Sequence, residues 1–152
     1  MYELKQSEPY FLYVEDDAED VELLQHALSD SAYDLKIVNA KNGEEACSLL
    51  ENSKDFSRLP EVIFLDVNMP RLDGKETLLC FKADKDIARI PVIVLSTSNR
   101  EADMRYFKDF HVPYLVKPGD VKEFKENLHE VLKGLLAFDF DFKSANKNTD
   151  AA

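Results

Sequence analysis

Five short apolar runs, separated by segments of helical period, constrain the fold of this chain more than any other feature of its sequence. They are YFLYV at 10–14, LKIVN at 35–39, EVIFLD at 61–66, PVIVLS at 91–96 and PYLV at 113–116. Their length and their branched and aromatic residues predict strands, and their continuous apolar character predicts burial on both faces. This alternation predicts an α/β fold, a doubly wound five-stranded parallel sheet covered by helices on both faces.

Capping patterns predict where several helices begin. Three polar residues stand three positions before an acid, as at many helix starts: Asp17 with Asp20, Asn42 with Glu45, and Ser98 with Glu101. After Asp120, apolar residues between Val121 and Leu135 recur on one helical face, which predicts the last helix.

The length and charge of the chain exclude several classes of function. Its 152 residues suffice for one domain with a core and leave no room for a second. It has 30 acidic and 19 basic residues, and its net charge of −11 opposes binding to a phosphate backbone. No leader pattern is visible, and no run approaches the roughly 20 apolar residues of a membrane span. We therefore expect a cytoplasmic protein that binds neither nucleic acid nor membrane.

The two cysteines, Cys47 and Cys80, lie in apolar helical settings, and neither has a second cysteine at metal-ligand spacing. We expect both to be small buried apolar side chains. A redox role would require a strained or exposed thiol.

Polar side chains stand where the predicted strands end. In open parallel sheets, ligands bind beyond the carboxyl ends of the strands, near the point where the strand order reverses. The acids, the hydroxyl and the cation at these ends are Glu15, Asp16, Asp17, Asp66, Ser96 and Lys117. If the first and third strands are neighbours, their carboxylates repel one another unless a cation joins them.

The types of these residues point to phosphate chemistry. Oxygen ligands without clustered His or Cys favour Mg²⁺, which commonly takes one or two carboxylates together with phosphate oxygens. Asp66 can then act as a nucleophile that forms an aspartyl phosphate. Lys117 offers a charge, and Ser96 a hydrogen bond, to the phosphoryl oxygens.

Four segments in order carry a family resemblance: VEDD at 14–17, LDVNMPRLDG at 65–74, VLSTS at 94–98 and YLVKP at 114–118. Over roughly residues 9–137 the chain resembles the receiver domain of two-component response regulators. The resemblance implies a flavodoxin-like sheet with the strand order 2-1-3-4-5. It also implies a receiver domain at residues 1–143, and we expect residues 144–152 to form a disordered tail.

The resemblance also implies roles for the acids at the strand ends. Asp66 would accept a phosphoryl group from a phosphohistidine of a sensor kinase, in a Mg²⁺-dependent reaction. Asp16, supported by Glu15, would hold the ion together with the backbone carbonyl of Asn68. Asp17 follows the acidic pair of the family, and its role stays open between a metal ligand and a helix cap.

A conformational switch is the second implication of the resemblance. Lys117 matches the cation of the family and Ser96 its switch hydroxyl. Phosphorylated Asp66 would draw Ser96 inward and vacate space into which Tyr114 can rotate. The readout would be the output face, the surface formed by the fourth helix, the fifth strand and the fifth helix. A fixed core aromatic is the alternative for Tyr114.

Two loops near these residues have distinctive sequences. After Asp66, Pro70 lacks an N–H and Gly74 tolerates positive φ, which predicts a tight turn that keeps Asp66 exposed at the rim of the sheet. Before the fifth strand, residues 110–113 replace the Gly-Ala pair that is common in the family, so we expect an unusual path there.

The partners follow from the same comparison. Residues 51–61 and VLSTS look like those of small stand-alone receivers paired with phytochrome-like kinases. No output-module pattern follows the last helix, so we expect a sensor histidine kinase or a phosphotransfer protein as partner and a signal that leaves through a protein contact. The AFDFDF segment at 137–142 predicts an extended tail, folded over the domain or in contact with the kinase or a second protomer. A homodimer would form through this tail or the output face.

Two other functions stay open beside that of a phosphoacceptor signalling protein. A receiver-like binding module would never accept phosphate, although Asp16, Asp66 and Lys117 are all present. A phosphohydrolase with an aspartate nucleophile would need a second Asp two residues after Asp66, where this chain has Asn68. Phosphorylation assays test the first alternative and phosphoester turnover the second.

Overall fold

A five-stranded parallel sheet forms the centre of the molecule. The computed structural model describes residues 8–56, 58–69, 71–117 and 119–136. The strand order is β2-β1-β3-β4-β5, as the family resemblance implied. The strands are β1 (Tyr10–Val14), β2 (Lys36–Ala40), β3 (Val62–Leu65), β4 (Val92–Ser96) and β5 (Tyr114–Val116). All five predicted strands are confirmed, and their ends shift by no more than one residue.

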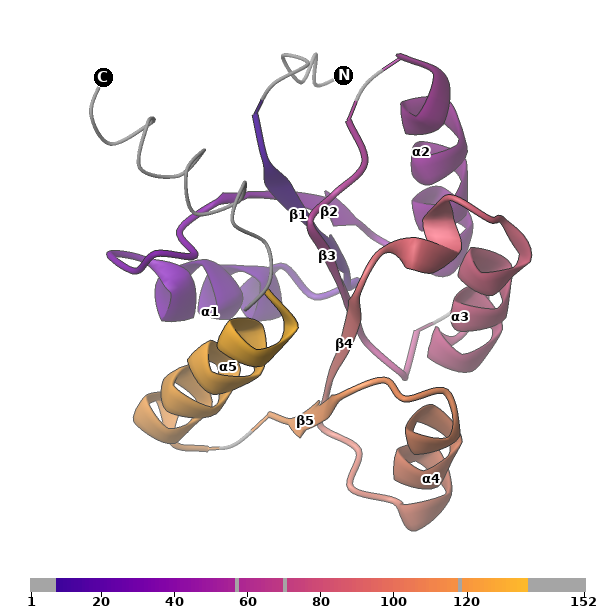
Figure 1. Cartoon of the computed structure of the whole chain (residues 1–152). Helices are drawn as coiled ribbons and strands as arrows, with labels where there is room; N and C mark the ends of the chain where they lie inside the picture. Colours follow the sequence, from indigo (N-terminus) through magenta and orange to yellow (C-terminus); the bar gives the residue numbers. More distant parts are fainter. Residues whose placement is uncertain (1–7, 57, 70, 118, 137–152) are drawn as a thin grey trace.

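Helices cover both faces of this sheet (Figure 1). They are α1 (Ala18–Leu28), α2 (Gly43–Phe56), α3 (Gly74–Ala83), the short 3₁₀ helix η1 (Ile87–Arg89), α4 (Glu101–Asp109) and α5 (Val121–Leu135). In Figure 1, α1 and α5 lie to the left of the sheet, and α2, α3 and α4 lie to its right. No helix in the described part of the chain combines the length and the apolar character needed to cross a bilayer.

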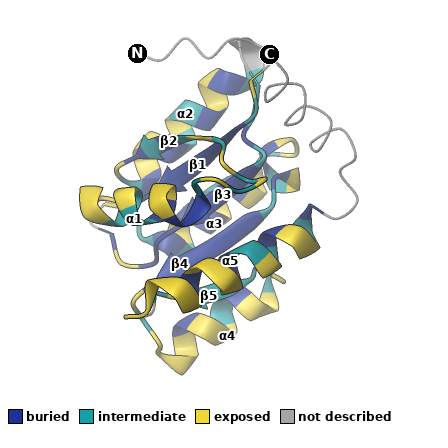
Figure 2. Ribbon diagram, turned by 90° about the vertical axis from the view of Figure 1, so that its left-hand side faces the viewer, coloured by how far each residue is buried: buried dark blue, intermediate teal, exposed yellow. Residues whose placement is uncertain are grey.

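The strands separate two apolar cores because successive side chains point to opposite faces. Leu12 and Val14 pack in the core beneath α2, α3 and α4, whereas Phe11 and Tyr13 pack in the core beneath α1 and α5. The rings of Phe11 and Phe64 meet edge to face with centroids 5.3 Å apart. The central strands β1, β3 and β4 are therefore buried along their whole length, as Figure 2 shows in dark blue.

The predicted helix caps form in part. The side chains of Asp17, Asn42 and Asp120 accept hydrogen bonds from backbone N–H groups of the first turns of α1, α2 and α5. The prediction that Ser98 caps the fourth helix is wrong, because α4 begins at Glu101 after Arg100. The Ser98 hydroxyl instead donates a hydrogen bond of 2.7 Å to the Asp103 carboxylate. A hydrogen bond to an ionised carboxylate is a strong one, and it turns the Ser98 side chain toward Asp103.

The unusual loop before β5 begins where α4 ends. His111 adopts φ of 58°, in the left-handed region that glycine usually occupies after a helix. Its N–H donates to the Lys108 carbonyl at 2.9 Å, and the N–H of Val112 donates to the Phe107 carbonyl at 3.0 Å. Both Val112 and Phe107 are buried. The two hydrogen bonds, with Val112 and Phe107 in the same apolar core, form a Schellman motif with a histidine in the glycine position.

His111→Gly should raise the free energy of unfolding by about 1 kcal/mol, because glycine adopts this backbone conformation without the steric cost of a Cβ. Urea unfolding at equilibrium measures the change. Asp109→Gly is the control, and it should change the free energy of unfolding by less than about 0.5 kcal/mol. Glycine costs only slightly more than aspartate in a helix, and the loss of an acid from the last turn offsets that cost. An unchanged or lower value for His111→Gly would contradict the left-handed assignment.

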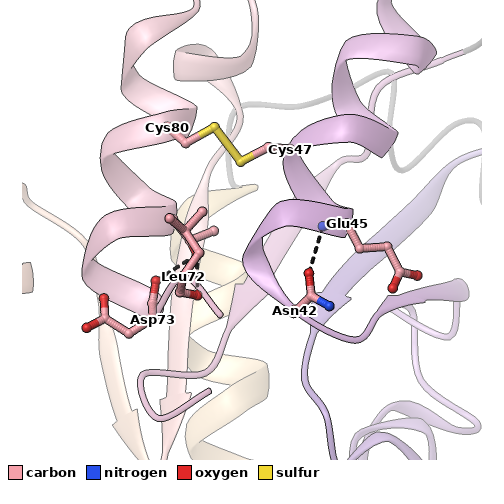
Figure 3. The surroundings of a disulfide bond; sticks show 7 residues. Asn42, Glu45, Cys47, Leu72, Asp73 and Cys80 are labelled. Carbon is pink, nitrogen blue, oxygen red and sulfur yellow. Dashed lines mark hydrogen bonds between the residues drawn. A yellow bond between two sulfur atoms is a disulfide. The ribbon is translucent and has the colours of Figure 1, made fainter. Parts of the chain in front are cut away.

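A disulfide joins α2 to α3 through Cys47 and Cys80 (Figure 3). The prediction of two separate buried thiols is therefore wrong. Both residues are only partly buried, and their Cα atoms lie 6.8 Å apart, at the long end of the usual range for disulfides. The sequence did not predict this disulfide because the two cysteines are 33 positions apart and meet only through the packing of two helices.

Two further contacts bring the same helices together. A Cβ on Gly43, at the start of α2, would lie 2.0 Å from the Thr77 hydroxyl oxygen on α3. A larger residue at 43 would therefore force the helices apart. Beyond the disulfide, the ammonium of Lys54 pairs with the carboxylate of Asp84. The two helices are thus tied along their length.

Removing the disulfide should lower the free energy of unfolding by about 2–4 kcal/mol, because the bond limits the entropy of the unfolded chain over a loop of this size. Denaturant unfolding with and without a reducing agent measures the loss, and a Cys47→Ser, Cys80→Ser double variant should not respond to the reductant. Alkylation of both thiols in unreduced wild type would show that the bond is absent.

Candidate functional site

The pairing of β1 with β3 brings acids together at the carboxyl edge of the sheet. Val14 and Leu65, the last residues of the two strands, are register partners. The Asp66 N–H donates to the Val14 carbonyl at 3.1 Å, which extends the pairing by one step. Glu15 and Asp66 therefore leave the sheet side by side.

Three carboxylates form one group at this edge. Glu15, Asp16 and Asp66 each offer an oxygen, and these oxygens all lie within 4.8 Å of one another. Glu15 and Asp66 are buried, at 2% and 7% exposure, while Asp16 is exposed. The prediction that Asp66 is exposed at the rim is therefore wrong. An all-oxygen donor set with one open side suits a hard divalent cation. This acid cluster, Glu15, Asp16 and Asp66, can thus bind a metal ion.

The other predicted ligands lie beside the cluster. Asp17 caps α1, since its carboxylate accepts from the Glu19 N–H at 2.9 Å. Its own N–H donates to the Glu15 carboxylate at 3.2 Å, so the backbone of Asp17 helps to orient the cluster. Asn68 is exposed, two residues after Asp66.

The two buried acids hold protons more tightly than free carboxyl groups do. Burial raises the pKa of Glu15 to about 7; the hydrogen bond from Lys117 opposes the shift, and the charge of Asp66 adds to it. Burial also raises the pKa of Asp66, against the charge of Lys117 and the N–H groups of Val67 and Asn68. A cation that replaced these protons would relieve the repulsion between the carboxylates.

Lys117 lies next to the cluster and is almost fully buried. Its Nζ donates to Glu15 Oε2 and to Asp20 Oδ2, each at 2.9 Å. The carboxylate of Asp66 lies farther than 4.0 Å, the ion-pair limit, from this ammonium. Burial alone would lower the pKa of Lys117, but its hydrogen bonds to Asp20 and Glu15 outweigh this effect and raise it.

Asp20 also belongs to this site, through its bond to Lys117. From the sequence it was predicted only as part of a helix start. It lies in the first turn of α1, which begins directly after the acids that follow β1. Acids in such a turn face the same edge of the sheet, and this position was the signal that could have revealed it.

The predicted switch residues lie on the other side of Asp66. Ser96 is fully buried, and its hydroxyl oxygen accepts from the Ser98 N–H at 3.1 Å. The Tyr114 hydroxyl donates to the Ser98 carbonyl at 2.8 Å, and the tyrosine is half-buried. The loop after β4 is therefore tied to β5 through Tyr114.

A second ionic group fixes the same loop to α3, and nothing in the sequence patterns indicated it. Asp103 is fully buried and accepts from Ser98 Oγ at 2.7 Å, Arg100 Nε at 3.0 Å and Lys75 Nζ at 2.8 Å. The bond from Lys75 is the largest cause that lowers the pKa of Asp103 to about 2. Asp103 therefore stays ionised and joins α3 to α4.

A hollow of about 300 Å³ lies between these helices and the loop after β3. It is lined by Val67, Asn68, Met69, Asp73, Lys75, Arg100 and Asp103. Through this hollow, solvent reaches the residues that follow Asp66.

The turn after Asp66 forms for a different reason than predicted. Arg71 and Leu72 carry the positive φ values, 52° and 60°, and Gly74 does not. A Cβ on Gly74 would lie 2.5 Å from the Asp66 carbonyl oxygen, so the glycine is needed for close approach of the backbones. Pro70 lies outside the described residues.

The comparison with known protein families decides the assignment of this site. The response regulator receiver domain matches residues 11–129 of the chain. The chain belongs to the response regulator receiver family. Receiver domains are signalling modules that work with histidine kinases, and the acid cluster lies in the part of the chain that matches.

Individual relatives resemble the chain over most of its length. Response regulator Rcp1 of Synechocystis sp. is 35% identical over 130 residues, which cover 84% of this chain and 86% of that protein. The crystal structure of the phosphorylated cyanobacterial phytochrome response regulator RcpA superposes with a TM-score of 0.74 at 32% identity, covering 85% of this chain and 94% of that chain. The Mn²⁺-bound form of Rcp1 gives 0.69 at 33% identity, covering 86% and 93%.

Mg²⁺ should bind more tightly as pH rises toward 7, because the pKa of Glu15 is about 7 in the folded protein against an ordinary value of 4.5. Between these values the folded state holds more protons than the unfolded chain, so in metal-free protein this group makes the free energy of unfolding fall as pH rises. Calorimetric Mg²⁺ titrations from about pH 5 to about pH 8 test this linkage.

Glu15→Gln is the control for that titration. It should flatten the pH dependence of Mg²⁺ affinity, because the amide does not titrate in this range. The same pH dependence in wild type and Glu15→Gln would contradict the role of Glu15.

Proposed function

We propose that this chain accepts a phosphoryl group on Asp66 from a phosphohistidine of a sensor histidine kinase and signals through a conformational switch. The observation that carries the proposal is the acid cluster around Asp66, in a chain of the receiver family. The phosphorylated state of the related RcpA and the Mn²⁺-bound form of Rcp1 support both parts of the chemistry.

The transfer is a substitution at phosphorus. A carboxylate oxygen of Asp66 forms the new O–P bond as the N–P bond of the phosphohistidine breaks, and the imidazole leaves as the neutral base after taking up a proton. The transition state is loose, so the protein acts mainly by position and charge. Mg²⁺ held by Glu15, Asp16, Asp66 and the Asn68 carbonyl would supply positive charge to the phosphoryl oxygens.

The side chains and backbone of the chain prepare this step. The Val67 N–H donates to Asp66 Oδ1 at 2.8 Å and so fixes the orientation of the carboxylate before transfer. Lys117 adds a second positive charge beside the acid cluster. Asp17 orients Glu15 through its N–H.

The switch begins at Ser96. Its hydroxyl would turn from the Ser98 N–H to a phosphoryl oxygen on Asp66 and draw the loop after β4 with it. The Tyr114–Ser98 hydrogen bond then breaks or shifts, which allows Tyr114 to rotate. The signal reaches the output face, formed by α4, β5 and α5.

The output face has apolar groups that a protein partner can cover. Met104 on α4, Val116 on β5 and Val121 at the start of α5 are 39%, 38% and 43% exposed. We infer that phosphorylation changes association here, with a phytochrome-like kinase, a phosphotransfer protein or a second protomer. The predicted tail contact at 137–142 and the tail at 144–152 lie outside the described residues, as does part of the proposed receiver domain at 1–143.

Incubation with Mg²⁺ and acetyl phosphate should add one phosphate to wild type, measured as intact mass. The gain should be absent without Mg²⁺ and in Asp66→Asn. Asp109→Asn, an exposed acid at the end of α4, is the matched control and should gain phosphate as wild type does.

Two other outcomes would favour the alternative functions. No gain in wild type would contradict phosphoacceptance and support a phosphate-independent binding module. Continuous hydrolysis of p-nitrophenyl phosphate that depends on Asp66 would support a phosphohydrolase.

A further inference from the structure

The ammonium of Lys117 has two carboxylate partners of different kinds. An ammonium has three N–H donors, and Lys117 uses two of them on Glu15 and Asp20. Glu15 belongs to the acid cluster, whereas Asp20 lies outside it, on α1. Asp20 is therefore the partner that Lys117 keeps when a cation takes Glu15.

Burial makes these partners necessary. The Lys117 side chain is 7% exposed and lies over the Tyr13 ring, with Nζ 6.0 Å from the ring centroid. A buried ammonium is costly unless carboxylates pair with it. Without Asp20, the only ion-pair partner left to Lys117 among the described residues is Glu15 of the cluster, and the ammonium would compete with the metal ion for it.

The distance from Lys117 to Asp66 also matters. The ammonium lies beyond ion-pair distance of the Asp66 carboxylate, although its charge still acts on the pKa of Asp66. The oxygens of an aspartyl phosphate extend two bonds farther from the chain than the carboxylate does. A lysine held off the carboxylate is thus placed for the phosphoryl group that will arrive.

We propose that Asp20 is a positioning residue that keeps Lys117 bound when a metal ion takes Glu15, so that the lysine stays ready for the phosphoryl oxygens. In this arrangement Lys117 keeps its bond to Asp20 while its third donor serves the phosphoryl group. The proposal rests on the proposed function of Asp66.

Asp20→Asn tests the proposal because it removes the charge and keeps the shape. Glu19→Gln is the matched control, since it removes the same charge from an exposed position in the same turn. Calorimetric titration with Mg²⁺ alone should show affinity reduced about tenfold in Asp20→Asn and less than about twofold in Glu19→Gln. Phosphorylation by acetyl phosphate should slow more in Asp20→Asn than in Glu19→Gln.

A Lys117→Met background separates positioning from a general charge effect. If Asp20 acts through Lys117, Asp20→Asn in this background should weaken Mg²⁺ binding no more than Glu19→Gln does. Equal losses from Asp20→Asn in both backgrounds, or equal losses from Asp20→Asn and Glu19→Gln in wild type, would overturn the proposal.

The two proposals fail in different ways. If wild type gains no phosphate, the proposed function fails, and the Mg²⁺ titrations still decide whether Asp20 retains Lys117 when a metal ion takes Glu15. If wild type gains phosphate and Asp20→Asn binds Mg²⁺ as Glu19→Gln does, only the positioning role fails. Asp20→Ser provides a second variant of the same test if Asp20→Asn does not give folded protein.

Discussion

The pairing of β1 with β3 is the constraint on which the site depends. Because Val14 and Leu65 are register partners, the residues that follow them, Glu15 and Asp66, leave the sheet next to each other. Apolar strands on both sides bury these acids, and burial raises the pKa of each. Their mutual repulsion must then be relieved by protons, by Lys117 or by a metal ion. The proposed metal binding and phosphoryl transfer depend on which of these three neutralises Glu15 and Asp66.

The three helices on one face of the sheet, α2, α3 and α4, are held by contacts of different kinds. The disulfide and the close approach at Gly43 bind α2 to α3, whereas α4 meets α3 through polar contacts centred on Asp103 and through Phe107 in the shared core. Ionic and hydrogen-bonded contacts can change partners without opening an apolar core. We therefore expect the switch to move α4 and its preceding loop while α2 and α3 stay in place.

The sequence predicted the strands and the parallel sheet well because strand patterns and their connections are local features that leave few topologies. The strand order itself was implied by the family resemblance. The sequence also predicted the cluster of Glu15, Asp16 and Asp66, since topology alone places strand ends at one edge. It missed the Asp20–Lys117 contact and the Cys47–Cys80 bond, because both join elements distant in the sequence. Gly74 was predicted for the wrong reason: its role depends on how closely the Asp66 backbone passes, which only packing determines.

A crystal structure with Mg²⁺ and beryllofluoride, which stands in for the phosphoryl group on Asp66, tests the account most directly. We expect the metal ion on Glu15, Asp16 and Asp66, and a fluoride in contact with Lys117 while that lysine keeps its bond to Asp20. A metal ion bound away from these acids, or no beryllofluoride on Asp66, would contradict the claim that the acid cluster makes this chain a phosphoacceptor.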